Sequence, residues 1–274
     1  MGESQSSQVF MFDDGNPEMQ RAYESARATF RYFWREVAWE RRRIIPGLDL
    51  ACVKAPFSDG QRKDADGAPR SEHMWLSDID FDGELVSGAL INSPNWVRSV
   101  KKGDSVRVPL NMICDWMYAI SGVVFGGYTV NLMRSRMEPQ ERQEHDAAWG
   151  LNFGDPSKVR VFPEPGMGGG LLKSWFSGQS AHTQEHPMSV NMAASLKKQL
   201  VKDPSLISST NDRGWTLLHH EALAGSAPTV KALLEAGADP NTQTNDGKTP
   251  LQLAQSLGWD NVVALLTSLS KAPT

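Results

Sequence analysis

The chain has 274 residues, of which 40% are hydrophobic, 22% charged and 8% aromatic, and its formal net charge is −4. This length is enough for two modest domains with buried cores, and the composition excludes a disordered, collagen-like or disulfide-scaffold chain. The mildly acidic balance argues against general affinity for nucleic acid, which requires a clustered basic excess. No apolar run reaches the roughly 18 residues that a membrane span needs.

The first residues, 1–15, lack the basic segment and the apolar stretch of a secretory signal, so the sequence predicts a flexible tail on a cytoplasmic protein. Cys52 and Cys114 have no Cys-x-x-Cys partner, which argues against a zinc site and a disulfide framework. We expect two buried, reduced thiols, no metal site and no cofactor.

Residues 16–43 are predicted to form a helix. Asn16 can cap it, Pro17 stands at the first helical position, and apolar residues follow with the 3–4 spacing of a buried stripe. These are Met19, Ala22, Tyr23, Ala26, Phe30, Phe33 and Val37. The opposite side carries Arg27, Arg31 and Arg35, and the helix closes with Arg41, Arg42 and Arg43, where cations complement the helix dipole. This arginine stripe is either a solvated, salt-bridged face or a docking surface for an acidic partner.

Short segments with alternating or β-branched and aromatic residues come next, separated by turn dipeptides such as Asp82-Gly83 and Ser121-Gly122. They are residues 48–57, 72–81, 85–91, 105–110, 115–120 and 123–133. A charged helix over 139–148 is predicted to end at Gly150. One helix on a curved antiparallel sheet indicates an α+β domain with a partly closed, barrel-like sheet. The pair Gly126-Gly127 permits a bulge or the close approach of another backbone.

Several strings of this first domain resemble a bacterial family. They are Phe30-Arg-Tyr-Phe-Trp-Arg-Glu36, Trp39-Glu-Arg-Arg-Arg43, Asp115-Trp-Met-Tyr118, Gly126-Gly-Tyr-Thr129 and His145-Asp-Ala-Ala-Trp-Gly150. Over residues 16–156 the chain is similar to the YegJ-like family of uncharacterised bacterial proteins, a domain of unknown function. The resemblance implies a bacterial chain, and it supplies no established activity and no catalytic residue.

Residues 157–187 are rich in proline and glycine, which is typical of a connector between domains. Its glycine-rich run, 166–170, lacks the strand before it and the Lys-Ser/Thr after it that a phosphate loop needs. The connector contains an apolar patch at 171–176, which is expected either to dock onto one of the two domains or to bind a partner.

The end of the chain repeats itself every 33 residues, which is the ankyrin period. Gly214, Thr216, Leu218, Gly225, Val230 and Leu233 recur as Gly247, Thr249, Leu251, Gly258, Val263 and Leu266. These strings resemble the ankyrin repeat. Thr216 and Thr249 stand where a hydroxyl can cap a helix, and Pro250 follows at the first helical position. The match departs from the family at Leu217, where proline is usual, and at Glu221, where a small residue is usual.

We therefore expect an all-α ankyrin array over 188–274, with a degenerate cap at 188–211 and repeats at 212–244 and 245–274. Such an array forms a concave face for macromolecules from its inner helices and its finger turns, which are the turns that precede the first helix of each repeat. The resemblance therefore implies a protein partner. The residues expected to bind it are Trp215, Gln243, Thr244, Asn245 and Lys248 on the finger edges, together with Arg41, Arg42 and Arg43. His219 and His220 diverge on their helix and are interpreted as structural.

The leading hypothesis is a non-enzymatic bacterial protein that binds another protein, in a sharper form an immunity-type protein that neutralises a toxin or secreted effector. It requires a free concave groove, and it fails if the chain's own upstream half fills that groove. The alternative is an enzyme or small-ligand-binding domain that the repeats recruit to its target. Its site would combine His145, Asp146, His73 and Tyr128 with Cys114. A structural protein that assembles into homo-oligomers is a third hypothesis.

Overall fold

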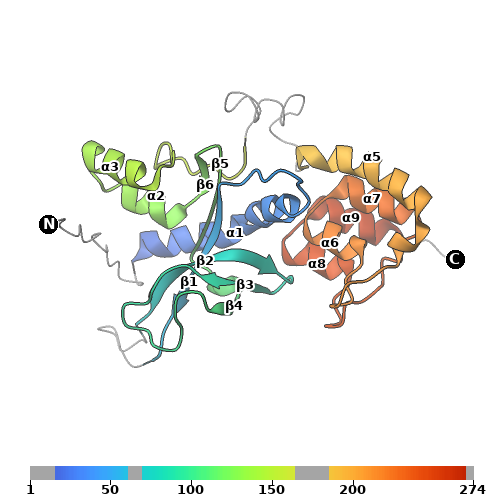
Figure 1. Cartoon of the computed structure of the whole chain (residues 1–274), viewed down its shortest axis with the longest axis horizontal. Helices are drawn as coiled ribbons and strands as arrows, with labels where there is room; N and C mark the ends of the chain where they lie inside the picture. The colour runs from blue at the N-terminus through green and yellow to red at the C-terminus, as the bar shows by residue number, and fades with distance from the viewer. Residues whose placement is uncertain (1–15, 61–69, 164–184, 270–274) are drawn as a thin grey trace.

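The computed structural model describes residues 16–60, 70–163 and 185–269. Its N-terminal half is a long helix packed on a six-stranded sheet, and its C-terminal half is a stack of paired helices (Figure 1). The long helix, α1, points out of the sheet domain toward the helical half (Figure 1). Within the described residues, no helix is both long and apolar enough to span a bilayer. The predicted α+β class with an ankyrin array is confirmed.

The helix α1 (Pro17–Glu40) confirms the first predicted element. The side chain of Asn16 accepts hydrogen bonds from the backbone N–H of Glu18 at 2.9 Å and of Met19 at 3.4 Å, which caps the first turn. The first part of α1 buries only its apolar stripe, whereas every residue from 33 to 39 is buried, the charged ones included. A helix that is buried all round lies between two partners. Here these are the sheet and the helical half.

The sheet has the strand order β4-β3-β2-β1-β5-β6, and all neighbouring strands are antiparallel. The strands are β1 (Leu50–Phe57), β2 (Glu72–Phe81), β3 (Leu85–Leu90), β4 (Ser105–Pro109), β5 (Asp115–Ile120) and β6 (Val123–Gly126). Residues on one face of the sheet, such as Val53 of β1 and Trp116 of β5, pack with α1 in the main core. The sheet is open, with β4 and β6 at its edges, so the expected barrel-like closure is not formed.

The prediction of a strand over 123–133 is wrong beyond Gly126. There β6 ends, and α2 (Tyr128–Arg134) begins after one residue. Gly126 and Gly127 have φ angles of 76° and 71°, which turn the chain out of the sheet. Because Gly127 has no capping side chain, the carboxylate of Asp115 accepts the N–H groups of Tyr128 and Thr129 instead, at 2.9 and 2.8 Å. A residue on another strand therefore starts this helix.

The close approach allowed by the glycine pair is confirmed. A Cβ at Gly126 would overlap the carbonyl oxygen and the indole ring of Trp116. The indole N–H of Trp116 donates to the carbonyl of Ala26 in α1 at 2.8 Å, so the same ring joins the sheet to the helix. Two of the family strings, 115–118 and 126–129, thus interlock, which gives them a structural role.

The charged helix α3 (Pro139–Trp149) ends at Gly150, as predicted, with a φ angle of 64° at the glycine. The chain then returns to the sheet, where the N–H of Gly126 donates to the carbonyl of Arg160 at 2.7 Å. The first residues of the predicted connector 157–187 therefore pack on the sheet domain. The apolar patch 171–176 lies outside the described residues, and the predicted domain boundaries stay a prediction.

The helical half consists of α5 (Pro187–Lys202), the short turn η2 (Pro204–Ile207), α6 (Leu217–Leu223), α7 (Ala227–Glu235), α8 (Pro250–Ser256) and α9 (Asp260–Leu269). Helix α6 packs against α8, and α7 packs against both α5 and α9. We call α6 and α8 the inner row, and α5, α7 and α9 the outer row. Capping boxes are present at Thr216 and Thr249, which confirms the predicted helix starts.

His219 has the structural role expected of it. Its Nδ1 accepts the N–H of Thr216 at 3.1 Å, so its Nε2 carries the proton and donates to the carbonyl of Thr242 at 3.0 Å. Burial lowers the pKa of His219, which keeps the ring neutral for both bonds. The ring therefore joins one finger turn of the array to the next.

Candidate protein-binding site

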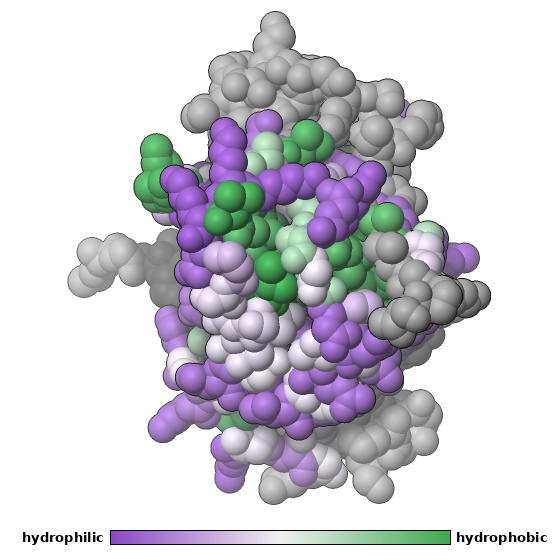
Figure 2. All heavy atoms as spheres, turned by 90° about the vertical axis from the view of Figure 1, so that its right-hand side faces the viewer, coloured by the Kyte–Doolittle hydropathy of each residue, from purple (hydrophilic) through white to green (hydrophobic). Residues whose placement is uncertain are grey.

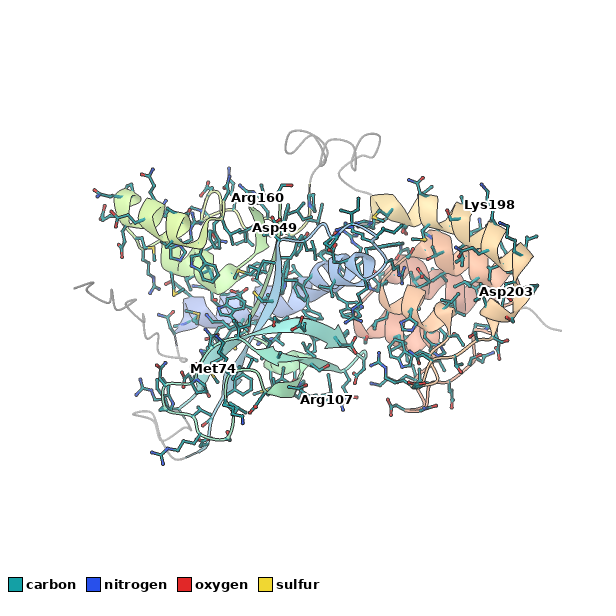
Figure 3. All side chains as sticks on the ribbon, viewed as in Figure 1. Asp49, Met74, Arg107, Arg160, Lys198 and Asp203 are labelled. Atoms are coloured by element: carbon teal, nitrogen blue, oxygen red, sulfur yellow. The ribbon has the colours of Figure 1, made fainter. Side chains whose placement is uncertain are left out.

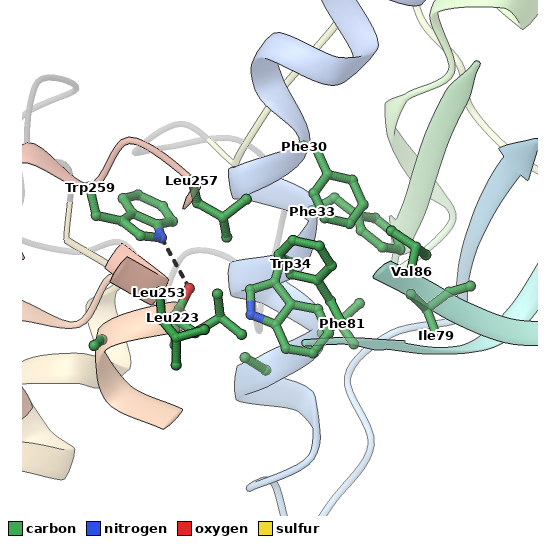
Figure 4. Packing of buried hydrophobic residues seen from close by; sticks show 14 of the residues in the cluster. Phe30, Phe33, Trp34, Ile79, Phe81, Val86, Leu223, Leu253, Leu257 and Trp259 are labelled. Atoms are coloured by element: carbon green, nitrogen blue, oxygen red, sulfur yellow. Dashed lines mark hydrogen bonds between the residues drawn. The ribbon is translucent and has the colours of Figure 1, made fainter. Parts of the chain in front are cut away.

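The N-terminal domain covers the inner row of the array. Trp34 of α1 lies between Phe81 of the sheet and three leucines of the array, Leu223, Leu253 and Leu257 (Figure 4). The turn between β2 and β3 reaches α8, where a Cβ on Gly83 would lie 2.6 Å from Cδ2 of Leu253. These apolar side chains belong to one core cluster that runs through both halves of the chain.

The arginine stripe of α1 takes part in this contact. Arg31 donates to the carbonyl of Gly258 at 2.9 Å. Arg35 is 5% exposed and lies over the rings of Tyr32 and Trp259, which stand edge-to-face with centroids 6.2 Å apart. At these positions the stripe contacts the array of the same chain, with Arg35 buried and Arg31 half-buried, so it is not a docking surface for an acidic partner.

The three arginines that follow the helix are also paired within the chain. Their ion pairs are Arg41 with Asp80 at 2.8 Å, Arg42 with Glu221 at 2.8 Å and Arg43 with Glu40 at 2.6 Å. Only the side chain of Arg41, at 47%, is largely exposed. The pair with Arg42 gives a physical reason for the unusual Glu221, because this carboxylate receives a cation from the N-terminal domain.

The cations of the finger turns pair with acidic residues at the end of β2 and in the turn between β2 and β3. Arg213 lies 3.0 Å from Asp80, and Lys248 lies 3.5 Å from both Asp82 and Glu84. Arg107 of β4, labelled in Figure 3, also pairs with Asp82 at 2.8 Å. We call this set of ion pairs the charged rim. Lys248, expected to bind a partner, is engaged in it.

The remaining predicted binding residues on the finger edges fall into a buried group and an exposed group. Trp215 and Thr244 are buried, at 3% and 5% exposure, although both were expected to be exposed. Trp215 packs beside His220, and Thr244 accepts the N–H of Lys248, so both support the fingers. Gln243 and Asn245 are exposed, as expected. The finger edge therefore offers a narrower surface than the sequence predicts.

The two successive fingers are bonded to each other. The backbone N–H of Asn245 donates to the carbonyl of Arg213 at 3.0 Å, and its side-chain amide donates to the carbonyl of Asp212 at 3.0 Å. Gly214 lies under this contact, where a Cβ would come within 2.5 Å of the Asn245 side chain. The exposed ends of the fingers are thus held in a fixed arrangement. This lowers the entropy that ordering them on a partner would cost.

The contact between the two halves has an apolar centre that resists separation. Trp34, Leu253, Leu257 and Trp259 are at most 8% exposed. At about 1.5–3 kcal/mol for each large apolar side chain, exposing them costs on the order of 6–12 kcal/mol, comparable with the whole stability of a typical protein. The expectation of a free concave groove is therefore wrong at the inner row, because the chain's own upstream half covers it.

Burial lowers the pKa of His220, at the edge of this contact, from 6.5 to about 4, and repulsion from Arg42 and Arg213 adds to the effect. The unfolded chain takes up this proton near pH 6.5 and the folded chain only near pH 4, so stability falls as the pH drops through this range. Allowing for the partial exposure of the ring, we expect a loss of about 2 kcal/mol. Urea unfolding of wild type and His220→Gln from pH 7 to pH 4 measures it. Parallel profiles for the two proteins would contradict the assignment.

The residues of the alternative catalytic site are not brought together. His145 contacts Asp146, with Nδ1 3.0 Å from Oδ1, but Asp146 also holds the buried Arg134 through two bonds of 2.7 and 2.6 Å. The other candidates lie elsewhere: His73 packs on Tyr23, which is in one cluster with Cys114, and the Tyr128 hydroxyl lies 2.7 Å from that of Thr29. Cys114 donates to the carbonyl of Met112. Asp146 therefore joins α3 to Arg134 of α2, and His145 contacts the same carboxylate.

The pair Arg134–Asp146 is expected to stabilise the fold, and His145 is not. We expect Asp146→Asn to lower the free energy of unfolding by about 2 kcal/mol, because it removes the charge that neutralises a guanidinium with a side chain only 1% exposed. His145→Gln serves as the control, with an effect within about 0.5 kcal/mol. Chemical denaturation of both variants measures the difference, and equal losses would refute the proposed division of roles.

A resident metal has no evident place among the described residues 16–60, 70–163 and 185–269, where no three His, Cys, Asp or Glu side chains gather in a metal-binding group. Asp115 is fully buried, and its pKa is raised by that burial. Its oxygens accept four hydrogen bonds from Trp116, Tyr128 and Thr129, which supports a capping role.

Trp34 and His186, which join the two halves, are not among the residues predicted from the sequence to be functional. His186 stacks on Trp39 with ring centroids 5.3 Å apart. A pattern that could have revealed this contact is present in α1, because Tyr32, Trp34 and Trp39 are aromatic residues outside the predicted apolar stripe. Large apolar residues on a second side of a helix indicate a second buried face.

Comparison with known proteins supports both predicted resemblances. A family model described as an uncharacterized protein conserved in bacteria (DUF2314) matches residues 16–153, and a model of three ankyrin repeats matches residues 189–272. The uncharacterized protein YegJ of Escherichia coli is 30% identical over 96 residues, which are 35% of this chain and 58% of YegJ.

A similarity also extends over nearly the whole chain. A putative ankyrin repeat protein of Neisseria meningitidis serogroup B is 41% identical over 260 residues, 95% of this chain and 97% of the relative. Among solved structures, a complex of a predatory endopeptidase from Bdellovibrio bacteriovorus with an immunity protein matches 30% of this chain and 42% of that chain, at 26% identity. Its TM-score of 0.27 carries no argument about fold or function. The chain belongs to the DUF2314 family of uncharacterized bacterial proteins, and it carries ankyrin repeats.

Proposed function

We propose that this chain acts by binding another protein through the exposed finger edge of its ankyrin array. The observation that carries the proposal is the bonded pair of fingers, which holds Gln243 and Asn245 exposed on a fixed scaffold. Ankyrin repeats are a binding scaffold, and the inner row is covered here, so the finger edge and the outer row are what the array offers to a partner.

The surface of the array that faces away from the N-terminal domain is compatible with this function. Apolar residues gather there in a patch bordered by hydrophilic ones (Figure 2). Exposed apolar patches with a polar border are common at protein-binding surfaces. Lys198 and Asp203 of the α5 region lie on this outer side of the array (Figure 3). A partner on the finger edge could extend its contact over this side.

A change of charge on the finger edge tests the proposal. We expect the double variant Gln243→Arg/Asp246→Arg, at two exposed positions, to weaken binding to the partner by at least about tenfold, which is 1.4 kcal/mol. The double variant Gln143→Arg/Glu144→Arg makes the same change of charge at exposed positions of α3, away from the array, and as the matched control it should bind within about threefold of wild type. The product of the neighbouring gene is the first protein to test as the partner, and calorimetry measures the affinity.

Either of two results would overturn the proposal. One is a wild-type protein that captures no stoichiometric protein from its native host. The other is a finger variant that binds its partner as tightly as wild type does.

An immunity-type function is the more specific form of this proposal, in which the partner is a toxin or secreted effector. It rests on analogy with small bacterial interaction proteins that combine such repeats with uncharacterised domains. Co-expression tests it: the chain should restore the growth of cells that express a toxic neighbouring gene product, and the finger variant should restore it less. A partner that is bound but not toxic would leave the general proposal intact and refute this form.

A further inference from the structure

We infer that the N-terminal domain permanently occupies the face of the inner row that it contacts, so that Glu221, Leu223 and Leu253 of α6 and α8 stay closed to outside proteins. The inference goes beyond the proposed function, because it concerns a surface that the proposed partner does not touch. Three features of the chain carry it: the residues that depart from the repeat pattern, the points where the chain leaves one half and enters the other, and the composition of the contact.

Two departures from the repeat pattern, at positions 221 and 259, lie where the N-terminal domain touches the array. Position 221 holds the glutamate that pairs with Arg42, whereas the equivalent position 33 residues later holds Ala254. Conversely, position 259 holds the tryptophan that packs on Tyr32, and the equivalent position 33 residues earlier holds Ser226. The inner row is therefore shaped and charged for one particular surface, the end of α1.

The chain leaves the sheet domain and enters the array on the same helix. Phe162 packs on Tyr32 with ring centroids 5.2 Å apart, and His186 stacks on Trp39. Residues 32 and 39 are about two turns apart, or roughly 10 Å along α1. His186 also places its Nε2 3.3 Å from the buried carboxylate of Glu36. The array is thus held against α1 at its first described residues, which makes rebinding of the inner row intramolecular and fast.

The contact has an apolar centre that excludes water and, around it, the charged rim, which is exposed to water. Trp34 and the leucines of the inner row are excluded from water, whereas Arg213 at the rim is 43% exposed. Exposed ion pairs contribute little, so breaking the rim alone does not open the contact. An outside protein that binds the inner row would have to displace the apolar centre. If the open form makes up about 1% of the chain, that protein must bind the open form about 10⁴-fold more tightly than the closed form to make the open form 99%.

Hydrogen exchange of the full chain tests the inference without any partner. We expect the backbone amides of α6 and α8 to exchange as slowly as those in the buried half of α1, within about threefold, because one opening event exposes both. An inner row that exchanges about 100-fold faster than α1 would overturn the inference, because it would show that the array opens on its own.

A charge reversal tests the same contact by a second route. Arg42→Glu places a carboxylate against Glu221, and we expect it to raise the exchange rates of α6 and α8 at least tenfold. Lys197→Glu reverses a cation in the exposed pair with Glu235 between α5 and α7, and it should leave these rates unchanged within about threefold. Unchanged rates in Arg42→Glu would overturn the inference. Arg42→Lys, which keeps the charge, should remain within about threefold of wild type.

These measurements are independent of the proposed function. The proposed function fails if the finger edge binds no protein, and exchange rates in the isolated chain do not depend on that outcome. A fast-exchanging inner row would refute the permanent contact while leaving the finger edge available to a partner.

Discussion

Replacing Trp34 by alanine is expected to lower the free energy of unfolding by about 3–5 kcal/mol, the cost of removing a large aromatic side chain from a core. Trp34 is 4% exposed and lies between the sheet and the inner row of the array (Figure 4). The cavity would therefore weaken both halves at once. Thermal unfolding should show one transition, lowered by about 10 °C.

Trp149→Ala is the matched control for this prediction. Trp149 is 43% exposed at the end of α3, so its removal should cost less than about 1 kcal/mol. If Trp34→Ala instead split the melting curve into two transitions, with the sheet domain unaffected, the two halves would be independent. The single core described above would then be wrong.

Replacing Gly126 by alanine is expected to have an effect of at least about 4 kcal/mol, enough to prevent folding of a marginally stable chain. Its φ angle of 76° disfavours any side chain, and the added Cβ would overlap the backbone carbonyl of Trp116, which is paired in the sheet and cannot move aside. Soluble yield and circular dichroism measure the outcome.

Gly103→Ala separates the two causes. Gly103 has a φ angle of 88°, but apart from its chain neighbours no atom of the described residues lies within 4 Å of the position of its added Cβ. This variant should therefore lose only about 1 kcal/mol, from backbone strain alone. Equal losses at both glycines would show that the contact with Trp116 plays no part.

The covered inner row changes what the ankyrin repeats imply. Repeats of this kind suggest protein binding, but the surface usually expected to bind is here part of the protein's own core. Of the eight residues expected to bind a partner, Gln243 and Asn245 are the ones that remain exposed at the finger edge, and Arg41 is exposed while paired with Asp80. A search for partners should therefore begin at the finger edge and on the outer row.

Local chemistry in the sequence was sufficient to locate most of the elements. Asn16 before Pro17 marks the start of α1, Gly150 marks the end of α3, and the recurrence of Thr216 as Thr249 marks the two repeats. These features depend on residues within one or two turns of each other, so a single sequence contains them. The resemblances to both families rest on equally local strings.

The tertiary structure alone decided what covers each surface. The strand predicted over 123–133 ends at Gly126, and a helix follows because Asp115, on another strand, caps it. The arginine stripe is partly covered because the array lies against Arg31 and Arg35. An apolar or charged pattern shows that a face needs a partner, but it does not identify that partner, because burial is non-directional and depends on contacts between residues far apart in the chain. For this reason the sequence correctly predicted an ankyrin array and wrongly expected its inner groove to be free.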